Sequence, residues 1–419
     1  MLPCACCDDP AFSLTPLPER VPPAGSPQAT VPDWLRQRLI AAGGDVPFSA
    51  YMAWVLHDPE HGAYGAGRLR IGPGGDFTTA PSLGPAFAEL LAPQLADWLE
   101  GLARAFPDGP LALVEAGPGE GQLAFDLSGA LAQRWPGLAE RLELVLVEPN
   151  PGMASRQRQR LACCPLPVRW SSFEQLAEHP VRGVVLAHEV LDALAVERFE
   201  HHRGHWSRQR VRLAGGGLEL VAAEPLSHAE REVLADLGLA EPGAGRPEGW
   251  CSEFHSGLGP WMAGCGSALA SGWLLVIDYA LEAWRYYAPA RSAGTLMAYR
   301  GQRAQADPLL DPGSWDLTAH LCTDSLDQAA LEAGWQPLGQ CRQGEALLAL
   351  GLAQALHGLS SAEEGLALAE CLGRREALLR LVDPAALGEF RWLAYGRALP
   401  ADGSSQSAPP LFLREPPLS

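Results

Sequence analysis

The chain has 419 residues, of which 47% are hydrophobic, and its formal net charge is -18 at pH 7. This length allows two domains or one elaborated α/β domain, and the acidic balance argues against nonspecific binding to nucleic acid or to an anionic membrane surface. All 31 basic residues are arginines, which excludes lysine Schiff bases, pyridoxal phosphate chemistry and phosphate loops that need a Gly-Lys-Ser or Gly-Lys-Thr sequence.

Residues 1–28 predict a disordered tail, because they are rich in Pro, Ser and Ala and show neither helical nor strand periodicity. Asp8 and Asp9 precede the first arginine, Arg20, and no apolar core of signal-peptide length is present, which argues against secretion and against a mitochondrial transit peptide. Apolar runs end before about 18 residues, so we expect no membrane insertion. The ten cysteines lack a regular framework and predict reduced thiols. These features favour the cytoplasm of a bacterium.

The next region, residues 29–110, is predicted to be helical around a glycine-rich loop. Apolar residues recur at helical spacing from Val31 to Ile40, from Ser49 to Leu56 and from Phe87 to Leu102. The loop between the second and third helices runs from Gly62 to Pro81.

The most informative motif is LALVEAGPGEGQL, at residues 111–123. An apolar strand ends in Glu115 and is followed by three glycines at alternate positions, Gly117, Gly119 and Gly121. Without a Cβ, these residues let the backbone turn sharply and approach a ligand closely before a helix begins. A dinucleotide fingerprint would need a glycine where this chain has Gln122, so the motif favours S-adenosylmethionine over NAD. The alternative is a plain strand-to-helix turn.

A second acidic strand end follows. Leu142–Val147 is a continuous apolar run, typical of a parallel strand buried on both faces, and it ends at Glu148. A carboxylate at this position of a βαβ unit can accept hydrogen bonds from both ribose hydroxyls of an adenosine cofactor. A helix over residues 151–161, strands near Val168 and at Gly183–Ala187, and a helix after Glu189 continue the βαβ alternation.

The pattern changes between about residues 197 and 265, which predicts an insertion within a main domain that spans residues 111–398. A hairpin at Arg203–Val221 is expected to turn at Gly215 and Gly216. The remaining predicted elements are, in chain order, helix Ser227–Leu237, helix Leu258–Ser271, strand Trp273–Asp278, helix Leu326–Ala333, paired strands near Gln336–Gly351, helices over Ala353–Leu381, an edge strand at Phe390–Tyr395, and a mobile tail over residues 399–419.

Eight motifs, in order along the chain, resemble the MidA family of class I S-adenosylmethionine-dependent methyltransferases. They are FSAYM at 48–52, residues 57–64, GDFTTAP at 75–81, residues 114–123, HEVLDAL at 188–194, IDY at 277–279, GTL at 294–296 and DLTAH at 316–320. The match extends from about residue 31 to about residue 397. The family includes the mitochondrial complex I assembly arginine methyltransferase, whose substrate is an arginine of a respiratory-complex subunit.

The resemblance implies a Rossmann-like α/β fold, with a mainly parallel seven-stranded sheet, helices on both faces, N-terminal helices and an inserted subdomain. The implied cofactor is S-adenosylmethionine, and its candidate binding residues are Glu115, Gly117, Pro118, Gly119, Gly121, Glu148 and His188. The chain departs from the family pattern at His188, Ala195 and Ala280, where the family usually has asparagine, proline and glycine. His188 can still donate a hydrogen bond in place of the amide.

Three carboxylates are the candidate catalytic residues: Glu189 and Asp192, at the carboxyl end of the fourth strand, and Asp76, in the glycine-rich loop. An acceptor arginine is protonated at physiological pH, so carboxylates are needed to orient one nitrogen and to absorb charge as a proton departs. Structural roles are the alternatives. Glu189 and Asp192 could interact with a helix dipole, and Asp76 could cap a turn.

A group of aromatic residues and two apparent metal-binding motifs give weaker predictions. Trp284, with Tyr286 and Tyr287, could form an aromatic wall around a substrate arginine or could pack as an ordinary lid. No metal site is predicted, because HEVLD at 188–192 lacks the second histidine of a zinc protease, and the pair Cys4 and Cys7 has no second pair.

The leading hypothesis is a methyltransferase that acts on a protein side chain, with arginine as the first acceptor to test. The expected partner is a protein substrate, for which the resemblance suggests a respiratory-complex subunit, and a homodimer is left open. A small-molecule N- or O-methyltransferase with the same cofactor site is one alternative. A non-catalytic assembly factor that keeps the cofactor site is the other.

Overall fold

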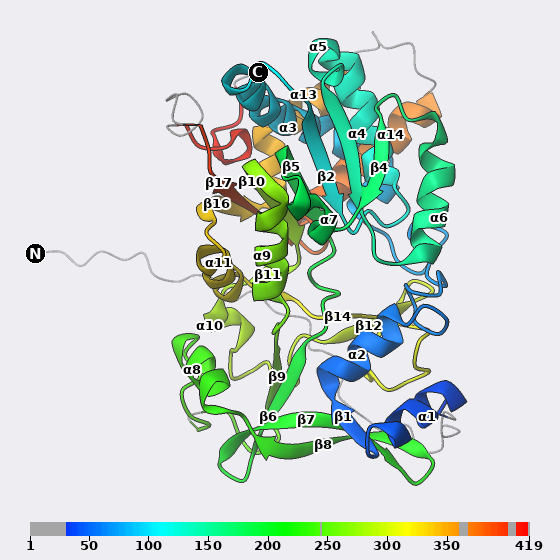
Figure 1. The fold of residues 1–419 in the computed structure, drawn as a ribbon, viewed down its shortest axis with the longest axis vertical. Helices are drawn as coiled ribbons and strands as arrows, with labels where there is room; N and C mark the ends of the chain where they lie inside the picture. The colour runs from blue at the N-terminus through cyan, green and yellow to red at the C-terminus, as the bar shows by residue number, and fades with distance from the viewer. Residues whose placement is uncertain (1–30, 244, 360–367, 401–407, 418–419) are drawn as a thin grey trace, which may run out of the picture.

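The computed structural model describes residues 31–243, 245–359, 368–400 and 408–417, and these residues form two lobes (Figure 1). The core lobe, at the top of the view, is built around a large sheet with helices on both faces. The accessory lobe lies below it and contains the smaller sheets. The predicted disordered tail over residues 1–28 lies outside the described residues.

The sheet of the core lobe has seven strands in the order β16-β17-β10-β5-β2-β3-β4. Their bounds are β2 (Leu111–Ala116), β3 (Leu142–Val147), β4 (Val168–Ser171), β5 (Val181–His188), β10 (Leu269–Asp278), β16 (Gln336–Arg342) and β17 (Arg391–Arg397). The strands from β10 to β4 are parallel neighbours, whereas β17 pairs antiparallel with both β10 and β16. The predicted mainly parallel sheet is therefore confirmed.

Alternate residues of each strand explain why both faces are covered. Leu111 and Leu113 of β2 join a core cluster with α3 and α4, whereas Ala112 and Val114 join a second cluster with α9. The first face also packs against α12 and α14, and the second against α7 and α11. The helices of this lobe are α3 (Ala86–Ala105), α4 (Gln122–Arg134), α5 (Pro136–Ala139), α6 (Pro151–Arg160), α7 (Phe173–Glu178), α9 (Leu258–Ala268), α11 (Thr323–Glu332), α12 (Gln343–Ala349), α13 (Leu352–Gly358) and α14 (Leu368–Leu381).

The accessory lobe is assembled from three separate stretches of chain. The first holds α1 (Asp33–Ala41), β1 (Asp45–Pro47) and α2 (Phe48–His57). The second holds β6 (Glu197–His202), β7 (His205–Ala214), β8 (Gly217–Pro225), α8 (His228–Asp236) and β9 (Cys251–Phe254). The third holds β11 (Ala280–Leu281), α10 (Ala283–Tyr286), β12 (Met297–Arg300), β13 (Arg303–Gln305), β14 (Asp316–Thr318) and β15 (Leu321–Cys322).

Contacts within the accessory lobe join all three stretches. β1 pairs with β7, and the Tyr51 hydroxyl of α2 donates a hydrogen bond to the Pro308 carbonyl at 2.8 Å. One apolar cluster includes Leu35, Val211 and Leu317, one residue from each stretch. Parts of the predicted N-terminal region and of the predicted insertion thus share a core, whereas α3 and α9 pack on the main sheet. The predicted hairpin is confirmed by β7 and β8, which turn at Gly215 and Gly216.

The predicted helix after Glu189 is wrong, and the following residues form turns. The Asp278 carboxylate explains the difference, because its Oδ2 accepts hydrogen bonds from the backbone N–H groups of Leu191 and Asp192, at 3.1 and 3.2 Å. Glu189 itself adopts a left-handed backbone conformation with φ 49°, which a right-handed helix cannot continue.

Two predictions about the last strands are also wrong. Gln336–Gly351 holds the single strand β16 followed by α12, and the partner of β16 is β17 rather than a neighbour in sequence. Phe390–Tyr395 corresponds to β17, which lies between β10 and β16 instead of at the sheet edge. β17 is buried along its length because it is covered on both faces, whereas the edge strand β16 is largely exposed.

The predicted mobile C-terminal tail is corrected for residues 408–417. Phe412 is buried in the core cluster of the main sheet and contacts Trp392, with ring centroids 5.5 Å apart. Its backbone N–H donates a hydrogen bond to Gln94 Oε1 at 3.1 Å. Phe412 thus anchors a segment whose composition is otherwise typical of a mobile tail. Among the helices of the described residues, none is both long and apolar enough to cross a bilayer.

Candidate active site

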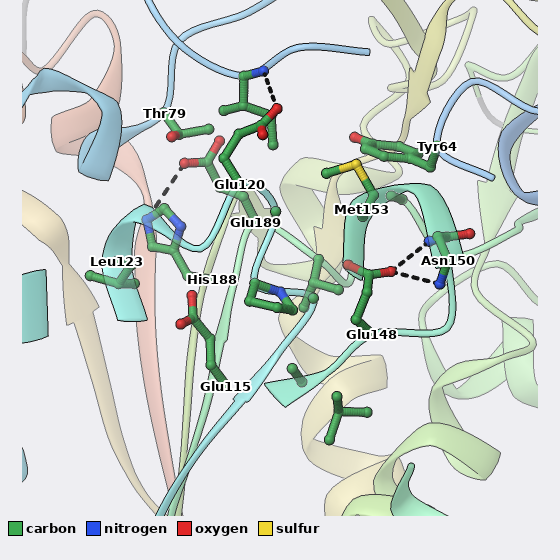
Figure 2. Close-up of a pocket in the computed structure, with 18 of the residues that line it drawn as sticks. Tyr64, Thr79, Glu115, Glu120, Leu123, Glu148, Asn150, Met153, His188 and Glu189 are labelled. Atoms are coloured by element: carbon green, nitrogen blue, oxygen red, sulfur yellow. Dashed lines mark hydrogen bonds and ion pairs between the residues drawn. The ribbon is translucent and has the colours of Figure 1, made fainter. Parts of the chain in front are cut away.

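A cavity of about 670 Å³ opens between the two lobes, at the carboxyl ends of β2, β3, β4 and β5. This is the edge at which doubly wound sheets bind ligands, and the volume is that of a small-molecule site. Of the predicted site residues, those that line the cavity are Glu115, Gly117, Pro118, Gly119, Glu148, His188 and Glu189. Figure 2 shows four of them, Glu115, Glu148, His188 and Glu189, around one space.

The glycine motif brings the backbone against neighbouring side chains. Gly117 and Gly119 have φ values of 64° and 53°. A Cβ on Gly117 would lie 2.3 Å from Val190 Cγ2, and one on Gly119 would lie 2.8 Å from Ile71 Cδ1. Both positions therefore favour glycine by conformation, and Gly117 needs it also for space, whereas a Cβ at Gly119 would only have to displace the end of the Ile71 side chain. Gly121 is the N-cap of α4, with φ 76°. It forms the turn into this helix and is not among the described residues that line the cavity.

Glu115 and His188 place polar atoms in a buried corner of the cavity. Burial raises the pKa of Glu115 to about 8 and lowers the pKa of His188 to about 3, so the imidazole is neutral. Within the described residues, Glu115 Oε2 and His188 Nε2 have no hydrogen-bond partner. Buried polar atoms without partners are costly, and here they lie where a polar group of a ligand could satisfy them.

Glu148 has the position expected of a ribose-binding acid. Its Oε1 accepts hydrogen bonds from Asn150 N and Nδ2, at 2.8 and 2.9 Å, and its Oε2 accepts one from Gln157 Nε2 at 2.9 Å (Figure 2). Gln157 Nε2 also lies 2.9 Å from the Gly119 carbonyl, to which it donates. Asn150 and Gln157 thus fix this carboxylate beside the glycine loop. Sequence reasoning missed both residues, although Asn150 stands only two positions after the strand-end acid.

Four carboxyl groups gather at one side of the cavity: Glu189, whose side chain is 12% exposed and lines the cavity, and the buried residues Asp192, Asp278 and Asp316. Burial and mutual repulsion raise the pKa of Glu189 and of Asp278 well above their ordinary values. Burial raises the pKa of Asp192 to about 7, and burial together with nearby Asp192 raises that of Asp316 to about 8. The site therefore concentrates carboxyl groups in a poorly solvated place.

The carboxyl cluster has no arginine counter-ion among the described residues. The basic side chain within ion-pair distance is the neutral His188, whose Nε2 lies 3.5 Å from Glu189 Oε1. Asp278 contributes by holding the turn at Leu191 and Asp192. Glu189 is the member of the cluster that lines the cavity, and the others stand behind it.

The structure gives Asp76 the turn-capping position. Its Oδ2 accepts a hydrogen bond from Arg70 N at 2.9 Å, and its Oδ1 accepts one from Gly301 N at 3.1 Å. Among the described residues, Asp76 is not part of the cavity wall. It instead fixes the glycine-rich loop against the turn between β12 and β13.

The predicted aromatic wall is not brought to the cavity. Trp284 is 76% exposed on the protein surface, whereas Tyr286 and Tyr287 are buried in the core of the accessory lobe. Aromatic residues that sequence reasoning missed do line the cavity, namely Tyr64, Phe77, Phe173 and Trp261. Within the described residues, no three His, Cys, Asp or Glu side chains gather as they would around a metal ion.

A doubly wound sheet with a glycine-lined cavity and a ribose-binding acid at its carboxyl edge defines a class I S-adenosylmethionine-dependent methyltransferase. Residues 90–341 match the model of a family described as "Putative S-adenosyl-L-methionine-dependent methyltransferase". The chain belongs to this family, and its cofactor is S-adenosylmethionine.

The similar proteins agree with this class. A crystal structure from Burkholderia thailandensis, described as a "likely methyl transferase" bound to S-adenosyl-homocysteine, shares 30% identity, with 92% of this chain and 95% of that chain covered and a TM-score of 0.78. The mitochondrial protein arginine methyltransferase NDUFAF7 homolog of Drosophila melanogaster is 28% identical, over 92% of this chain and 91% of the relative. NDUFAF7 of Danio rerio is 28% identical, over 67% of each chain.

The residues of the cavity fit the cofactor. Glu148 is fixed at the end of β3 with both oxygens facing polar hydrogens, and a carboxylate oxygen can accept more than one hydrogen bond. The backbone at Gly117 leaves no room for a side chain, and a Cβ at Gly119 would have to displace Ile71 Cδ1. Glu115 Oε2 and His188 Nε2 provide an unsatisfied acceptor and a ring nitrogen at the inner end. Figure 2 shows Glu148 and Glu189 on different walls of this space.

Proposed function

We propose that the enzyme methylates arginine side chains of a protein substrate. The observation that carries this proposal is the cluster of four carboxyl groups beside the cofactor cavity, three of them buried and one, Glu189, on the cavity wall, without an arginine counter-ion among the described residues. A guanidinium remains protonated at any physiological pH. It is therefore the acceptor that such a cluster would bind most favourably.

The energetics of the cluster support a cationic acceptor. Desolvation and repulsion between ionised carboxylates raise the pKa values of these groups, and a cationic acceptor would favour their ionised form, whereas a neutral or anionic acceptor would not. A guanidinium presents planar N–H donors that match carboxylate oxygens. A guanidinium that enters the site would lower the pKa of the nearby carboxyl groups. Its charge-assisted hydrogen bonds to them would offset the cost of their burial.

Residues of the chain itself position the acceptor for methyl transfer. S-adenosylmethionine supplies a methyl group on a sulfonium, whose departure leaves a neutral thioether. Glu189, on the cavity wall, accepts hydrogen bonds from the guanidinium and aims one nitrogen into the cavity. The carboxyl cluster takes up the proton which that nitrogen loses. The apolar walls at Ile71 and Phe77 exclude water, and most of the rate advantage comes from orientation and this poorly solvated site.

The relatives support the acceptor, because those from Drosophila melanogaster and Danio rerio are named protein arginine methyltransferases. A respiratory-complex subunit as the substrate and a homodimeric state belong to the same proposal. So does a bacterial cytoplasmic location; the similar crystal structure comes from a bacterium, whereas the NDUFAF7 relatives are named as mitochondrial.

The test is transfer of label from methyl-labelled S-adenosylmethionine into a size-fractionated lysate, followed by amino-acid analysis. We expect label in macromolecules, recovered as methylarginine. Glu189→Gln should abolish the transfer while keeping affinity for S-adenosyl-homocysteine, and Glu232→Gln, at an exposed residue of α8, should leave it unchanged. Label confined to small metabolites would overturn the proposal in favour of a small-molecule methyltransferase. Cofactor binding without any transfer would favour an assembly factor.

A further inference from the structure

The accessory lobe contributes one member of the carboxyl cluster, Asp316. Asp316 begins β14 and pairs in register with Tyr299 of β12. The residue is 3% exposed, and its Oδ1 has no hydrogen-bond partner among the described residues. An unpartnered acceptor at this depth costs free energy.

Tyr64 connects Asp316 with the cavity. It lines the cavity, and its hydroxyl is placed to donate a hydrogen bond to the Asp316 carboxyl. The Tyr64 ring stacks on His57 at a centroid distance of 6.1 Å, which fixes its orientation. While its hydrogen is directed to Asp316, the phenol oxygen keeps lone pairs that can accept from a donor in the cavity. Figure 2 shows Tyr64 and Glu189 on opposite walls.

Glu189 and Tyr64 come from different lobes. Glu189 follows β5 of the core sheet, and Tyr64 follows α2 of the accessory lobe. Both Asp192 and Glu189 lie near enough to raise the pKa of Tyr64. The cavity end between them is therefore bounded by acceptors on both sides, an arrangement suited to a flat cation with N–H groups along its edges.

We propose that the accessory lobe supplies the second half of the acceptor subsite, in which Tyr64 accepts a hydrogen bond from the guanidinium and Asp316 positions the Tyr64 hydroxyl. The inference rests on the proposed function and adds to it Tyr64 and a specific role for Asp316. Glu189 holds one edge of the guanidinium and Tyr64 the other, so the acceptor is bound only when the two lobes are in place.

The test compares two peptides in the presence of saturating S-adenosyl-homocysteine, one with a central arginine and one with the neutral analogue citrulline. Calorimetry on the full chain gives the ratio of their affinities. We expect the wild type to prefer arginine, and both Tyr64→Phe and Asp316→Asn to reduce that preference by about tenfold, the effect of losing one hydrogen bond to a charged group. The double variant should lose little more than either single one, because both changes break one chain of contacts.

The controls distinguish a failure of the proposed function from a failure of the inference about Tyr64 and Asp316. Asp236→Asn, at an exposed residue of α8 in the same lobe, should keep the preference, and the affinity for S-adenosyl-homocysteine should be unchanged in every variant. Tyr64→Phe removes a single hydroxyl, so it addresses the inference even if Asp316→Asn fails to fold. A wild type that binds S-adenosyl-homocysteine but does not prefer arginine would overturn the proposed acceptor. A wild type that prefers arginine, with variants that retain this preference, would overturn the role of Tyr64 and Asp316 alone.

Discussion

At the residue scale, the glycine motif combines two requirements that can be tested separately. Gly119 has a left-handed backbone, which costs about 1–2 kcal/mol for a residue with a Cβ. A Cβ added there would lie 2.8 Å from Ile71 Cδ1, so the end of the Ile71 side chain would have to move. Gly215, in the hairpin between β7 and β8, has nearly the same φ, 55°, but a Cβ added there would meet no atom within 4 Å. It is therefore a matched control for backbone strain.

We expect Gly119→Val to abolish binding of S-adenosyl-homocysteine, because the side chain enters the cavity wall next to Ile71. Gly215→Val should lower the melting temperature by a similar backbone cost and leave binding intact. Calorimetry and thermal melts measure both effects. If Gly119→Val keeps its affinity, the cofactor site has been placed incorrectly.

The raised pKa values of Asp192 and Asp316, about 7 and about 8, predict how acceptor binding depends on pH. A guanidinium binds the ionised carboxylates, so its affinity should increase as pH rises from about 6 to about 8 and these groups lose their protons. Calorimetry of the arginine peptide across this range, with S-adenosyl-homocysteine bound, measures the slope. A flat profile would mean that neither carboxyl group takes part in acceptor binding.

At the scale of elements, Arg156 of α6 fastens the glycine-rich loop beside the cavity. Its Nη1 and Nη2 donate hydrogen bonds to the carbonyls of Gly67 and Leu69, at 3.0 and 2.9 Å. Its Nε lies 3.2 Å from Glu120 Oε2, and Glu120 Oε1 accepts from Ile71 N at 3.4 Å. One side chain thus joins the loop, the glycine motif and α6, and it holds Ile71 in the cavity wall.

Arg156→Ala should speed dissociation of S-adenosyl-homocysteine several-fold, because the loop loses charge-assisted hydrogen bonds worth about 1.5–3 kcal/mol each. Stopped-flow displacement measures the rate. Arg158→Ala removes an exposed arginine of the same helix and should leave the rate near that of the wild type. Equal rates in both variants would show that the loop does not retain the cofactor.

An element could be predicted from the sequence where the residues that determine it lie close together in the chain. The glycine motif and Glu148 are encoded in contiguous sequence, so both their location and their strands could be predicted. The turn after β5 could not, because the group that caps it, Asp278, is distant in sequence. The same holds for Tyr64 and Asp316, which meet only once the accessory lobe has assembled. The interior place of β17 depended on strand order, which periodicity does not reveal.

At the scale of the whole molecule, buried carboxyl groups make folding stability depend on pH. The folded-state pKa values of Glu115, Asp192 and Asp316, about 8, 7 and 8, lie above the ordinary values of 4.5, 3.8 and 3.8. The folded state then holds protons that the unfolded chain releases, so this stability is fully present below about pH 4 and is lost as pH rises towards about 8.

Denaturant unfolding of the cofactor-free protein should accordingly give a lower free energy of unfolding at about pH 8 than at about pH 5.5. Glu115→Gln should reduce this difference, because the amide needs no proton to remain neutral. The comparison should be made without ligand, since binding adds its own stabilisation. A free energy of unfolding that increases over the same range of pH would contradict the prediction.

The division of the accessory lobe among three stretches of chain has a consequence for biosynthesis. α1 and α2 leave the ribosome long before β12 and β14, whose residues complete their apolar core. Until then, Phe48 and Met52 have no finished surface on which to pack. The nascent chain must keep this N-terminal part from aggregating until β12 and β14 have been synthesised, so completion of this lobe depends on contacts between segments far apart in the sequence.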